Sequence, residues 1–454
     1  MRPVKLQALA SEMGGRVTRG DVSVSGVVLD SRRVRPGDLF VALPGHHADG
    51  HDFLEAAAAA GASAALVTRF TEVDLPQWCV SDPRRVLVEL ACQVRSTTHA
   101  AVVGVTGSNG KTTVKEMLAG ILAHRGACQA TVGNLNNELG VPLTLCSLAP
   151  EDRFAVVEMG CGRPGDINLL SSWARPVIGL VTNVGPAHLG EFGSLEAIAR
   201  CKGELFAALP ADGWAVINAD DPFADTWEQQ AAHCHILRFS LTGQSADITG
   251  TVRAPGVLAI ELPDMASLEV HVPLPGRHNL ANALAAAAAA YAAGATPDAI
   301  VAGLEGLTPT AGRLHTRAGR AGSVLIDDSY NANPASLRAA LETAAAESGP
   351  LWLVLGDMGE LGEAAPDYHA EAGALARDLG VARLYATGAL SALAAEAFGE
   401  GGQTFASRTE LIEAIRPDLT AGLRVLIKGS RSAQMDEVVQ GLAADPEPGG
   451  APCC

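Results

Sequence analysis

A glycine-rich turn between an apolar strand and a helical pattern limits the fold of this chain more than any other feature. The apolar run at 101–106 leads into the turn, and a helical pattern over 114–124 follows it. Glycines let backbone N–H groups wrap around phosphate oxygens, and the start of a helix favours negative charge. The pattern therefore predicts a nucleotide-binding sheet. We predict that the nucleotide is bound by Gly107, Ser108, Asn109, Gly110, Lys111, Thr112 and Thr113.

This loop departs from the strict Walker pattern, which needs glycine six residues before Lys111, where the chain has Val105. We therefore predict a variant phosphate loop rather than the GTPase form. The alternative is an ordinary glycine-rich turn. The Gly-Lys-Thr-Thr ending and the two flanking elements argue against that alternative, because lysine and threonine there reach phosphates and magnesium.

The length of 454 residues is too great for one ordinary core and suits about three domains. Strand and helix patterns alternate, which favours an α/β fold. In the first block, the run at 22–29 predicts a single strand. We predict a substrate-binding domain at 1–100, a central P-loop ATPase-type sheet domain at 101–312, a Rossmann-like domain at 313–445 and a disordered tail at 446–454.

Composition and charge limit the kinds of partner and the cellular compartment that we expect for the chain. The formal net charge of −17 argues against general nucleic-acid binding, because neutralising phosphates needs Lys and Arg. Nine cysteines without a C-x-x-C pair fit a reducing compartment. Residues 1–15 lack the apolar run of a signal peptide, and the alanine-rich stretch 281–294 predicts a packed helix rather than a membrane span. We therefore expect a cytoplasmic monomer without membrane or nucleic-acid partners.

Polar residues follow two apolar strand patterns in the second block. Glu158 ends the run at 155–158, and His188 lies shortly after the run at 178–183. Ligands bind at the carboxyl ends of parallel strands, and carboxylates are preferred magnesium ligands. A histidine after a strand is often structural, but beside a phosphate loop and Glu158 we expect a metal or phosphate contact. Lys202 lies on a helical pattern, where its residue type alone favours a solvated side chain.

Further candidates surround the boundary between the second and third blocks. Asn279 is predicted to cap the alanine-rich helix, and Asn282 could read adenine, although a pure capping segment is the alternative. Arg313 is an ordinary surface residue unless domain closure brings it to a phosphoryl group. The polar cluster at 327–336 is either a capped loop or a site. A cationic loop at 428–432 suits a carboxylate or phosphate.

Taken in order, these segments resemble the Mur ligase family over nearly the whole chain. The shared motifs are residues 106–113, Glu158, His188, Lys202, 277–282, Arg313 and Asp328. The family combines a UDP-binding first domain, a central ATPase domain and a Rossmann-like third domain. The resemblance implies ATP and Mg²⁺ as cofactors, with phosphate binding by Lys111. It implies magnesium ligands at Thr112, Glu158, His188 and a carbamylated Lys202, adenine contact by Asn282, γ-phosphate contact by Arg313 and ribose contact by Asp328.

Other segments resemble the branch of this family that adds D-alanyl-D-alanine, namely 30–32, 36–43, 49–53, 133–143, 327–334, 356–362 and 428–432. The D-N-P-R signature of the diaminopimelate- or lysine-adding branch is absent from the third block. The resemblance implies ATP-dependent joining of D-alanyl-D-alanine to UDP-N-acetylmuramoyl-tripeptide through an acyl-phosphate. The residues it implies in substrate binding are Asp30, Ser31, Arg32, Asn134, Asn136, Asn137, Tyr330, Asn331, Asn333 and Arg431.

Two kinds of alternative stay open. One is another ligase of this type, adding lysine or diaminopimelate, or a folylpolyglutamate synthase. The segment at 327–334 and the missing D-N-P-R signature argue against both. The other is a nucleotide-gated binding protein that hydrolyses ATP without ligating anything. Glu158, His188 and Lys202 together argue against it, since such a switch needs no two-metal site.

Overall fold

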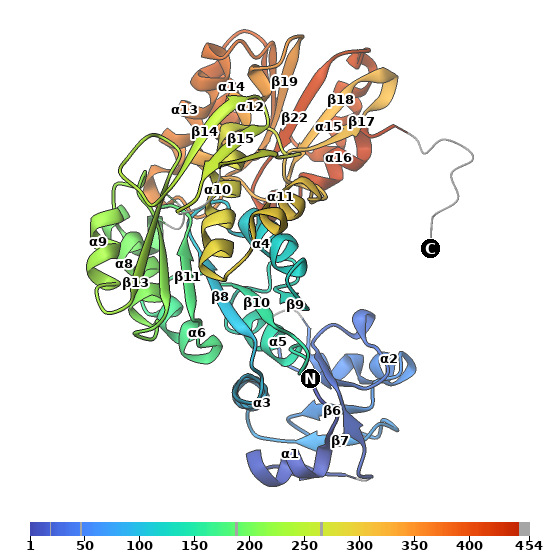
Figure 1. Ribbon diagram of the computed structural model, residues 1–454. Helices are drawn as coiled ribbons and strands as arrows, with labels where there is room; N and C mark the ends of the chain where they lie inside the picture. The colour runs from blue at the N-terminus through green and yellow to red at the C-terminus, as the bar shows by residue number, and fades with distance from the viewer. Residues whose placement is uncertain (19, 46–47, 187–188, 264–266, 445–454) are drawn as a thin grey trace.

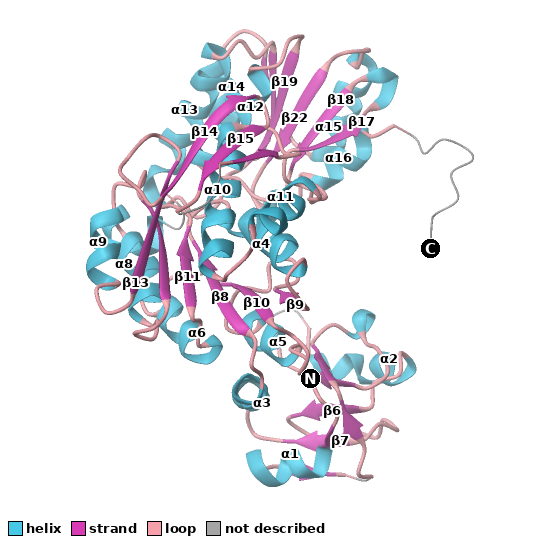
Figure 2. Cartoon of the chain, in the orientation of Figure 1, coloured by secondary structure: helices cyan, strands magenta, loops and turns pink. Residues whose placement is uncertain are grey.

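Three sheet-containing units follow one another along an elongated molecule, with the N-terminal unit at one end and the C-terminal unit at the other (Figure 1). The structure is a computed structural model that describes residues 1–454 except 19, 46–47, 187–188, 264–266 and 445–454. The predicted disordered tail at 446–454 lies outside the described residues. Helices cover the sheets of all three units, as the α/β prediction requires (Figure 2).

The N-terminal unit contains a five-stranded sheet in the order β2-β7-β6-β5-β4, parallel except for β2 against β7, and a separate β1–β3 pair. The predicted single strand at 22–29 is wrong, because Ser25 N bonds to Gly37 O and divides it between the two sheets. The elements are β1 (Val4–Lys5), α1 (Leu6–Met13), β2 (Arg16–Val17), β3 (Ser23–Val24), β4 (Gly26–Val28), β5 (Asp38–Val41), α2 (Leu54–Ala59), β6 (Ala64–Val67), β7 (Gln77–Cys79) and α3 (Pro83–Thr97).

The central unit is built on a nine-stranded sheet in the order β16-β15-β14-β13-β12-β11-β8-β10-β9. The strands from β9 to β14 run parallel, and β15 and β16 form an antiparallel extension. Its strands are β8 (Ala101–Thr106), β9 (Cys128–Ala130), β10 (Phe154–Glu158), β11 (Ile178–Val181), β12 (Trp214–Asn218), β13 (His235–Ser240), β14 (Ile248–Ala254), β15 (Val257–Glu261) and β16 (Leu268–His271). Its helices are α4 (Lys111–Ala123), α5 (Gly140–Cys146), α6 (Asp166–Ala174), α7 (Leu189–Phe192), α8 (Leu195–Ala207), α9 (Ala224–Gln230), α10 (Arg277–Ala292) and α11 (Pro297–Glu305).

The C-terminal unit has a six-stranded sheet in the order β17-β18-β22-β19-β20-β21, parallel except for the edge strand β17. Its strands are β17 (His315–Ala318), β18 (Val324–Asp328), β19 (Leu351–Gly356), β20 (Arg383–Thr387), β21 (Gly402–Phe405) and β22 (Arg424–Lys428). Its helices are α12 (Pro334–Ala345), α13 (Ala365–Asp378), α14 (Ser391–Phe398), α15 (Arg408–Ile415) and α16 (Asp436–Leu442).

Helix α10 confirms the prediction that the alanine-rich stretch is a packed helix. Its residues from Ala283 to Ala290 are buried on every face. Alanine side chains are short, so α10 lies close against α4 and the central sheet and forms part of one continuous core with them. None of the described helices combines the length and the apolar character needed to cross a membrane.

Candidate active site

The topology places the glycine-rich loop at a switch point of the central sheet. Strand β8 lies between β10 and β11, and the loop follows β8 directly. Glu158 ends β10 and Thr182 follows β11, so both lie at the same carboxyl edge as the loop. The crevice at this edge is where open α/β sheets bind their ligands.

Two glycines fix the path of this loop. Gly107 has φ of 148° and Gly110 has φ of 81°, a region that favours glycine. A Cβ at Gly107 would collide with the Thr182 hydroxyl, and one at Gly110 would collide with the Asn282 side chain. Helix α4 then begins at Lys111 without a side-chain cap, which leaves its first N–H groups facing the crevice.

The segment after β11 holds the loop through hydrogen bonds. Thr182 Oγ1 donates to the Asn109 carbonyl oxygen at 2.6 Å, and the Asn183 side-chain oxygen accepts from Asn109 N at 3.0 Å. Ser108 Oγ donates to the Gly185 carbonyl at 3.1 Å and accepts from Gly185 N at 2.9 Å. The loop is thus held in shape by side chains that sequence reasoning left out of the site.

Lys111 folds over its own loop. Its Nζ donates to the carbonyl oxygens of Gly107 at 2.7 Å and Ser108 at 3.3 Å. Burial, followed by the positive charges of Lys202 and Arg313, lowers the pKa of Lys111 to about 8. Several cations that repel one another in this way favour an anionic ligand between them.

An acid, a hydroxyl and an arginine meet beside the loop. Thr112 Oγ1 donates to Glu158 Oε2 at 2.9 Å, and Asn136 Nδ2 donates to Glu158 Oε1 at 2.7 Å. Arg313, at the start of the C-terminal unit, donates to Thr112 Oγ1 at 3.0 Å. Glu158 is buried, so its two hydrogen bonds keep the carboxylate oriented toward Thr112.

Lys202 is buried, which is not the solvated position that its residue type alone favours. Its Nζ lies 3.5 Å from the Cys161 sulfur, and no carboxylate lies within ion-pairing distance of it among the described residues. The Cys201 thiol, by hydrogen bonding, and then Lys202 and Lys111, by their charge, hold the pKa of the Cys161 thiol well below its ordinary value against the effect of burial. Cys161 itself was not among the predicted site residues.

The start of α10 approaches the loop through Asn282. The predicted cap at Asn279 is wrong, because the N-cap is Gly276 and the Asn279 amide instead donates to the Pro275 carbonyl at 2.7 Å. Asn279 Oδ1 accepts from Asn282 Nδ2 at 3.2 Å. The Asn282 oxygen lies against Gly110, so the helix presents an amide at the edge of the phosphate loop.

The C-terminal unit brings a second charged cluster. Lys428 ends β22 and forms an ion pair with Asp328 at the end of the neighbouring β18. Lys428 Nζ also donates to the Asn331 carbonyl at 2.9 Å, and Asp328 Oδ1 accepts from Leu314 N at 3.2 Å. Sequence reasoning placed Lys428 in a cationic loop but not among the site residues. Its position at the end of an apolar strand is the signal that could have identified it.

Tyr330, Arg313 and Arg431 line the same face. The Arg313 guanidinium lies 4.3 Å from the centre of the Tyr330 ring, which orients the arginine toward Thr112. Arg431 remains largely exposed, 3.8 Å from the Asp436 carboxylate. It is therefore free to move toward a ligand.

Asn333 joins the C-terminal unit to the phosphate loop. Its Nδ2 donates to Asn109 Oδ1 at 2.7 Å. Its Oδ1 accepts from Ser336 N at 2.9 Å, and the Ser336 hydroxyl completes a capping box at the start of α12. Asn333 stays a predicted substrate contact, although both ends of its amide are already paired within the protein.

The central and C-terminal units enclose a cleft of about 1440 Å³. Every predicted site residue that the structure describes lines this cleft, except Asp30, Ser31 and Arg32. Those three lie in the N-terminal unit, where Asp30 pairs with Arg32 at 2.7 Å and has its pKa lowered to about 2, chiefly by that hydrogen bond. His188 lies outside the described residues.

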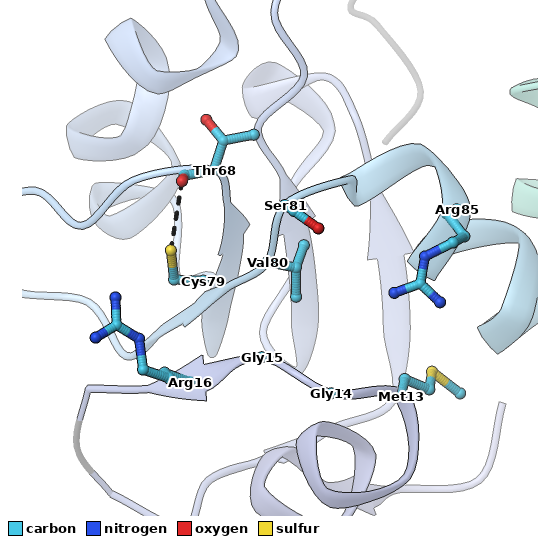
Figure 3. Close-up of a pocket in the computed structure, with 9 residues that line it drawn as sticks. All are labelled: Met13, Gly14, Gly15, Arg16, Thr68, Cys79, Val80, Ser81 and Arg85. Atoms are coloured by element: carbon cyan, nitrogen blue, oxygen red, sulfur yellow. Dashed lines mark hydrogen bonds between the residues drawn. The ribbon is translucent and has the colours of Figure 1, made fainter.

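A smaller hollow of about 310 Å³ lies in the N-terminal unit (Figure 3). It is flanked by Arg16 of β2 and Arg85 of α3 and contains no predicted site residue. Arg85 already pairs with Glu89 at 2.5 Å. The central cleft, with its convergent loop, acid and cations, is therefore the candidate active site.

A phosphate loop at a sheet switch point, an acid beside it and an arginine from the C-terminal unit are typical of a nucleotide-dependent group-transfer enzyme. More particularly, the chain belongs to the Mur ligase family. Family models match residues 23–125 ("Mur ligase family, catalytic domain"), 105–290 ("Mur ligase middle domain") and 312–431 ("Mur ligase, glutamate ligase domain"). This confirms the resemblance inferred from the motifs.

Named relatives cover almost the whole chain. The UDP-N-acetylmuramoyl-tripeptide--D-alanyl-D-alanine ligase of Escherichia coli K12 is 42% identical over 97% of this chain and 99% of its own length. The crystal structure of MurF from Acinetobacter baumannii has a TM-score of 0.85 and 32% identity, and covers 97% of this chain and 98% of that one. MurF ligase from Thermotoga maritima, solved in complex with ADP, has a TM-score of 0.77 and 30% identity, and covers 92% and 97%. The predicted three-domain α/β fold is confirmed by these structures.

Proposed function

We propose that this chain is the ATP-dependent ligase that joins D-alanyl-D-alanine to UDP-N-acetylmuramoyl-tripeptide, forming ADP. The observation that carries the proposal is its 42% identity, across 97% of the chain, to a ligase named for that reaction. The geometry of the cleft supports it, since the phosphate loop and two further cationic clusters converge where a phosphoryl group would pass between substrates.

We propose that the nucleotide is held by residues 107–113 of the loop, with Lys111 at the phosphates. Lys111 must leave the carbonyl oxygens it now bonds, and the charge of the phosphates favours that exchange. Arg313 reaches the same position from the other side and would stabilise charge on the transferring group. We propose that Asn282, whose oxygen lies against Gly110, contacts the adenine and that Asp328 contacts the ribose.

The residues beside the loop fit Mg²⁺ by their chemistry. The Thr112 hydroxyl and the Glu158 carboxylate are hard oxygen donors 2.9 Å apart. The described residues contain no group of three or more His, Cys, Asp or Glu side chains that could form a complete metal cage, so substrate phosphates and water would supply the other ligands. Bound Mg²⁺ would offset the repulsion between a carboxylate and a polyphosphate. His188 and a carbamylated Lys202 stay proposed as further ligands.

The proposed reaction in the cleft has two chemical steps. The terminal carboxylate of the muramoyl peptide attacks the γ-phosphorus and forms an acyl-phosphate, and ADP leaves. The free amine of the dipeptide then attacks the acyl carbon, and inorganic phosphate leaves. Because water would compete with the amine, contacts that hold the C-terminal unit against the loop are part of the mechanism.

We propose that Tyr330, Asn331 and Arg431 receive the dipeptide. They offer neutral hydrogen-bonding groups and one mobile cation for its single carboxylate. Asn134, Asn136 and Asn137 of the central unit also line the cleft, and we propose that they contact the peptide of the muramoyl substrate. Asp30, Ser31 and Arg32 would hold the UDP end in the N-terminal unit, which is consistent with their distance from the cleft.

We keep the proposed division at residues 1–100, 101–312 and 313–445, and we propose that the enzyme acts in the cytoplasm as a monomer. Seven cysteines are described, and none of them forms a disulfide, as a reducing compartment favours.

The deciding experiment compares two substrate pairs with the purified full chain and ATP. UDP-muramoyl-tripeptide with D-alanyl-D-alanine should be turned over faster than UDP-muramoyl-dipeptide with lysine or diaminopimelate, measured by phosphate release and product mass. Faster turnover of the second pair would overturn the proposal. Phosphate release without product from either pair would instead favour the nucleotide-gated binding protein.

A further inference from the structure

Two cysteines lie side by side next to Lys202. Cys161 follows β10, three residues after Glu158, and lines the central cleft. Cys201 lies on α8, immediately before Lys202. Its thiol donates at 3.4 Å to the carbonyl oxygen of Arg163, two residues beyond Cys161, and the amine of the adjacent Lys202 lies 3.5 Å from the Cys161 sulfur. The loop and the helix that carry these thiols therefore meet at the site.

The two segments are also fixed to each other by Glu204, one turn beyond Cys201. Its carboxylate accepts from Gly165 N and from Asn168 N, both at 2.9 Å. These bonds clamp the segment that carries Cys161 onto α8. A disulfide requires nearby Cβ atoms, and these bonds keep the two segments that carry the thiols together.

We propose that Cys161 and Cys201 are a redox modification site, where a peroxide oxidant forms a reversible disulfide that stops turnover. The inference rests on the proposed ligase function. The Cys161 sulfur attacks one peroxide oxygen, the O–O bond breaks, and a sulfenic acid and water form. The Cys201 sulfur then attacks the Cys161 sulfur and displaces the hydroxyl, which leaves as a second water with the Cys201 proton. Two thiols are oxidised and one peroxide is reduced.

The order of attack follows from exposure. Cys161 faces the cleft, whereas Cys201 is 1% exposed, so a small oxidant reaches Cys161 first. The linkage would draw the Cys161 sulfur toward α8 and away from the Lys202 amine, now 3.5 Å from it. Lys202 would lose its polar contact, and the segment following Glu158 would shift. Nucleotide in the cleft should slow the reaction by covering Cys161.

The test treats the full-length enzyme with hydrogen peroxide, removes the peroxide with catalase, and maps peptides without reduction. We expect a peptide pair linked through Cys161 and Cys201, a fall in turnover of roughly tenfold or more, and recovery with dithiothreitol. ATP with magnesium should slow formation of the linked pair. Absence of the linked pair from inactivated enzyme, or full activity of the linked form, would overturn the proposal.

Two variants test whether the loss of turnover depends on the pair of Cys161 and Cys201. Cys201→Ala should keep its untreated activity but lack a resolving thiol, so peroxide should carry Cys161 on to sulfinic acid, which dithiothreitol does not reverse. Cys234→Ala, on a thiol that donates to the Ala231 carbonyl at 3.2 Å, should behave like the unchanged chain. Peptide mapping and a measurement of ADP binding both work without the amine substrate. These two measurements would therefore still report the disulfide if the proposed substrates of the ligase were wrong.

Discussion

Lys111 is the side chain on which phosphate binding most directly depends. It is the cation of the loop, and its burial, followed by the charges of Lys202 and Arg313, lowers its pKa to about 8. We predict that Lys111→Ala reduces ATP-dependent product formation roughly a hundredfold or more, because a charge-stabilising donor is lost at the phosphates. The measurement is phosphate release, with circular dichroism to check the fold. Lys5→Ala, on an exposed lysine of the N-terminal unit, is the control. A folded Lys111→Ala enzyme with full activity would refute the assignment.

Lys202 differs from the other fully enclosed lysine of the central unit. Lys115 donates to the Thr131 carbonyl at 2.6 Å and pairs with Glu116 at 2.6 Å, whereas Lys202 has only the Cys161 sulfur at 3.5 Å among its described contacts. A buried ammonium without an acidic partner is costly, so conversion to a carbamate beside metal ions is favoured.

We therefore predict that Lys202 is carbamylated in active enzyme. Lys202→Ala should lower turnover roughly ten- to a hundredfold. Bicarbonate should partly restore wild-type enzyme prepared at low pH, and ¹³C-bicarbonate should give a carbamate carbon signal that is absent from Lys202→Ala. A free ammonium seen at Lys202 in a crystal of an active preparation would contradict the prediction.

Most side chains of the cleft could be predicted because each follows a strand or opens a helix. Glu158, Thr112 and Asp328 carry such signals within a few residues. Lys428 was missed although it ends an apolar strand pattern. Cys161 was missed because its importance comes from Lys202, 41 residues further along the chain, which only the fold brings near. Local sequence does not encode that proximity.

Among the elements, the start of α12 has two roles that can be separated. Asn333 caps the helix through Ser336, and its amide also reaches Asn109 in the phosphate loop. We predict that Asn333→Ala lowers stability by about 1 kcal/mol through the cap and also lowers kcat through the lost loop contact. Ser336→Ala removes part of the capping box alone, so it should leave kcat nearly unchanged.

A double-mutant cycle checks that the loop contact is direct. Asn109→Ala and Asn333→Ala combined should show a coupling of about 1 kcal/mol in kcat/KM. Strict additivity of the two single effects would mean that Asn333 acts only as a cap.

Elements that alternate apolar strands with helices were predictable, and β8 has the predicted bounds of 101–106. The strands β13 to β16 were not predicted. β13 and β14 end the parallel part of the central sheet, and β15 and β16 extend it antiparallel. Buried and exposed residues alternate along β16, and β14 has one buried residue, Ile248, so neither strand is a continuous apolar run. Their place is set by pairing with β13 and by the buried face of α10, which are contacts of the whole fold.

For the whole molecule, the relation of the C-terminal unit to the central unit determines whether the cleft is complete. Apart from the contacts at the loop, the two units touch where α7 meets the 3₁₀ turn Gly362–Ala364. Gly190 and Gly362 face each other there, and a Cβ on Gly190 would lie 3.1 Å from the Gly362 Cα. The close approach is backbone against backbone, so no side chain can rotate away to relieve an added methyl group.

We predict that Gly190→Ala disfavours the closed arrangement while leaving each unit intact. Gly362 is the poorer target, because its φ of 65° would strain any substitution. Overlap of the added methyl group with the Gly362 backbone would cost about 1–3 kcal/mol in the closed state, which would lower turnover roughly tenfold. Nucleotide affinity should stay nearly unchanged. Small-angle scattering with both substrates should show a larger radius of gyration than the unchanged enzyme. Leu195→Ala, on an exposed side chain of the neighbouring helix α8, is the control. Unaltered turnover and size in Gly190→Ala would show that catalysis does not require this contact.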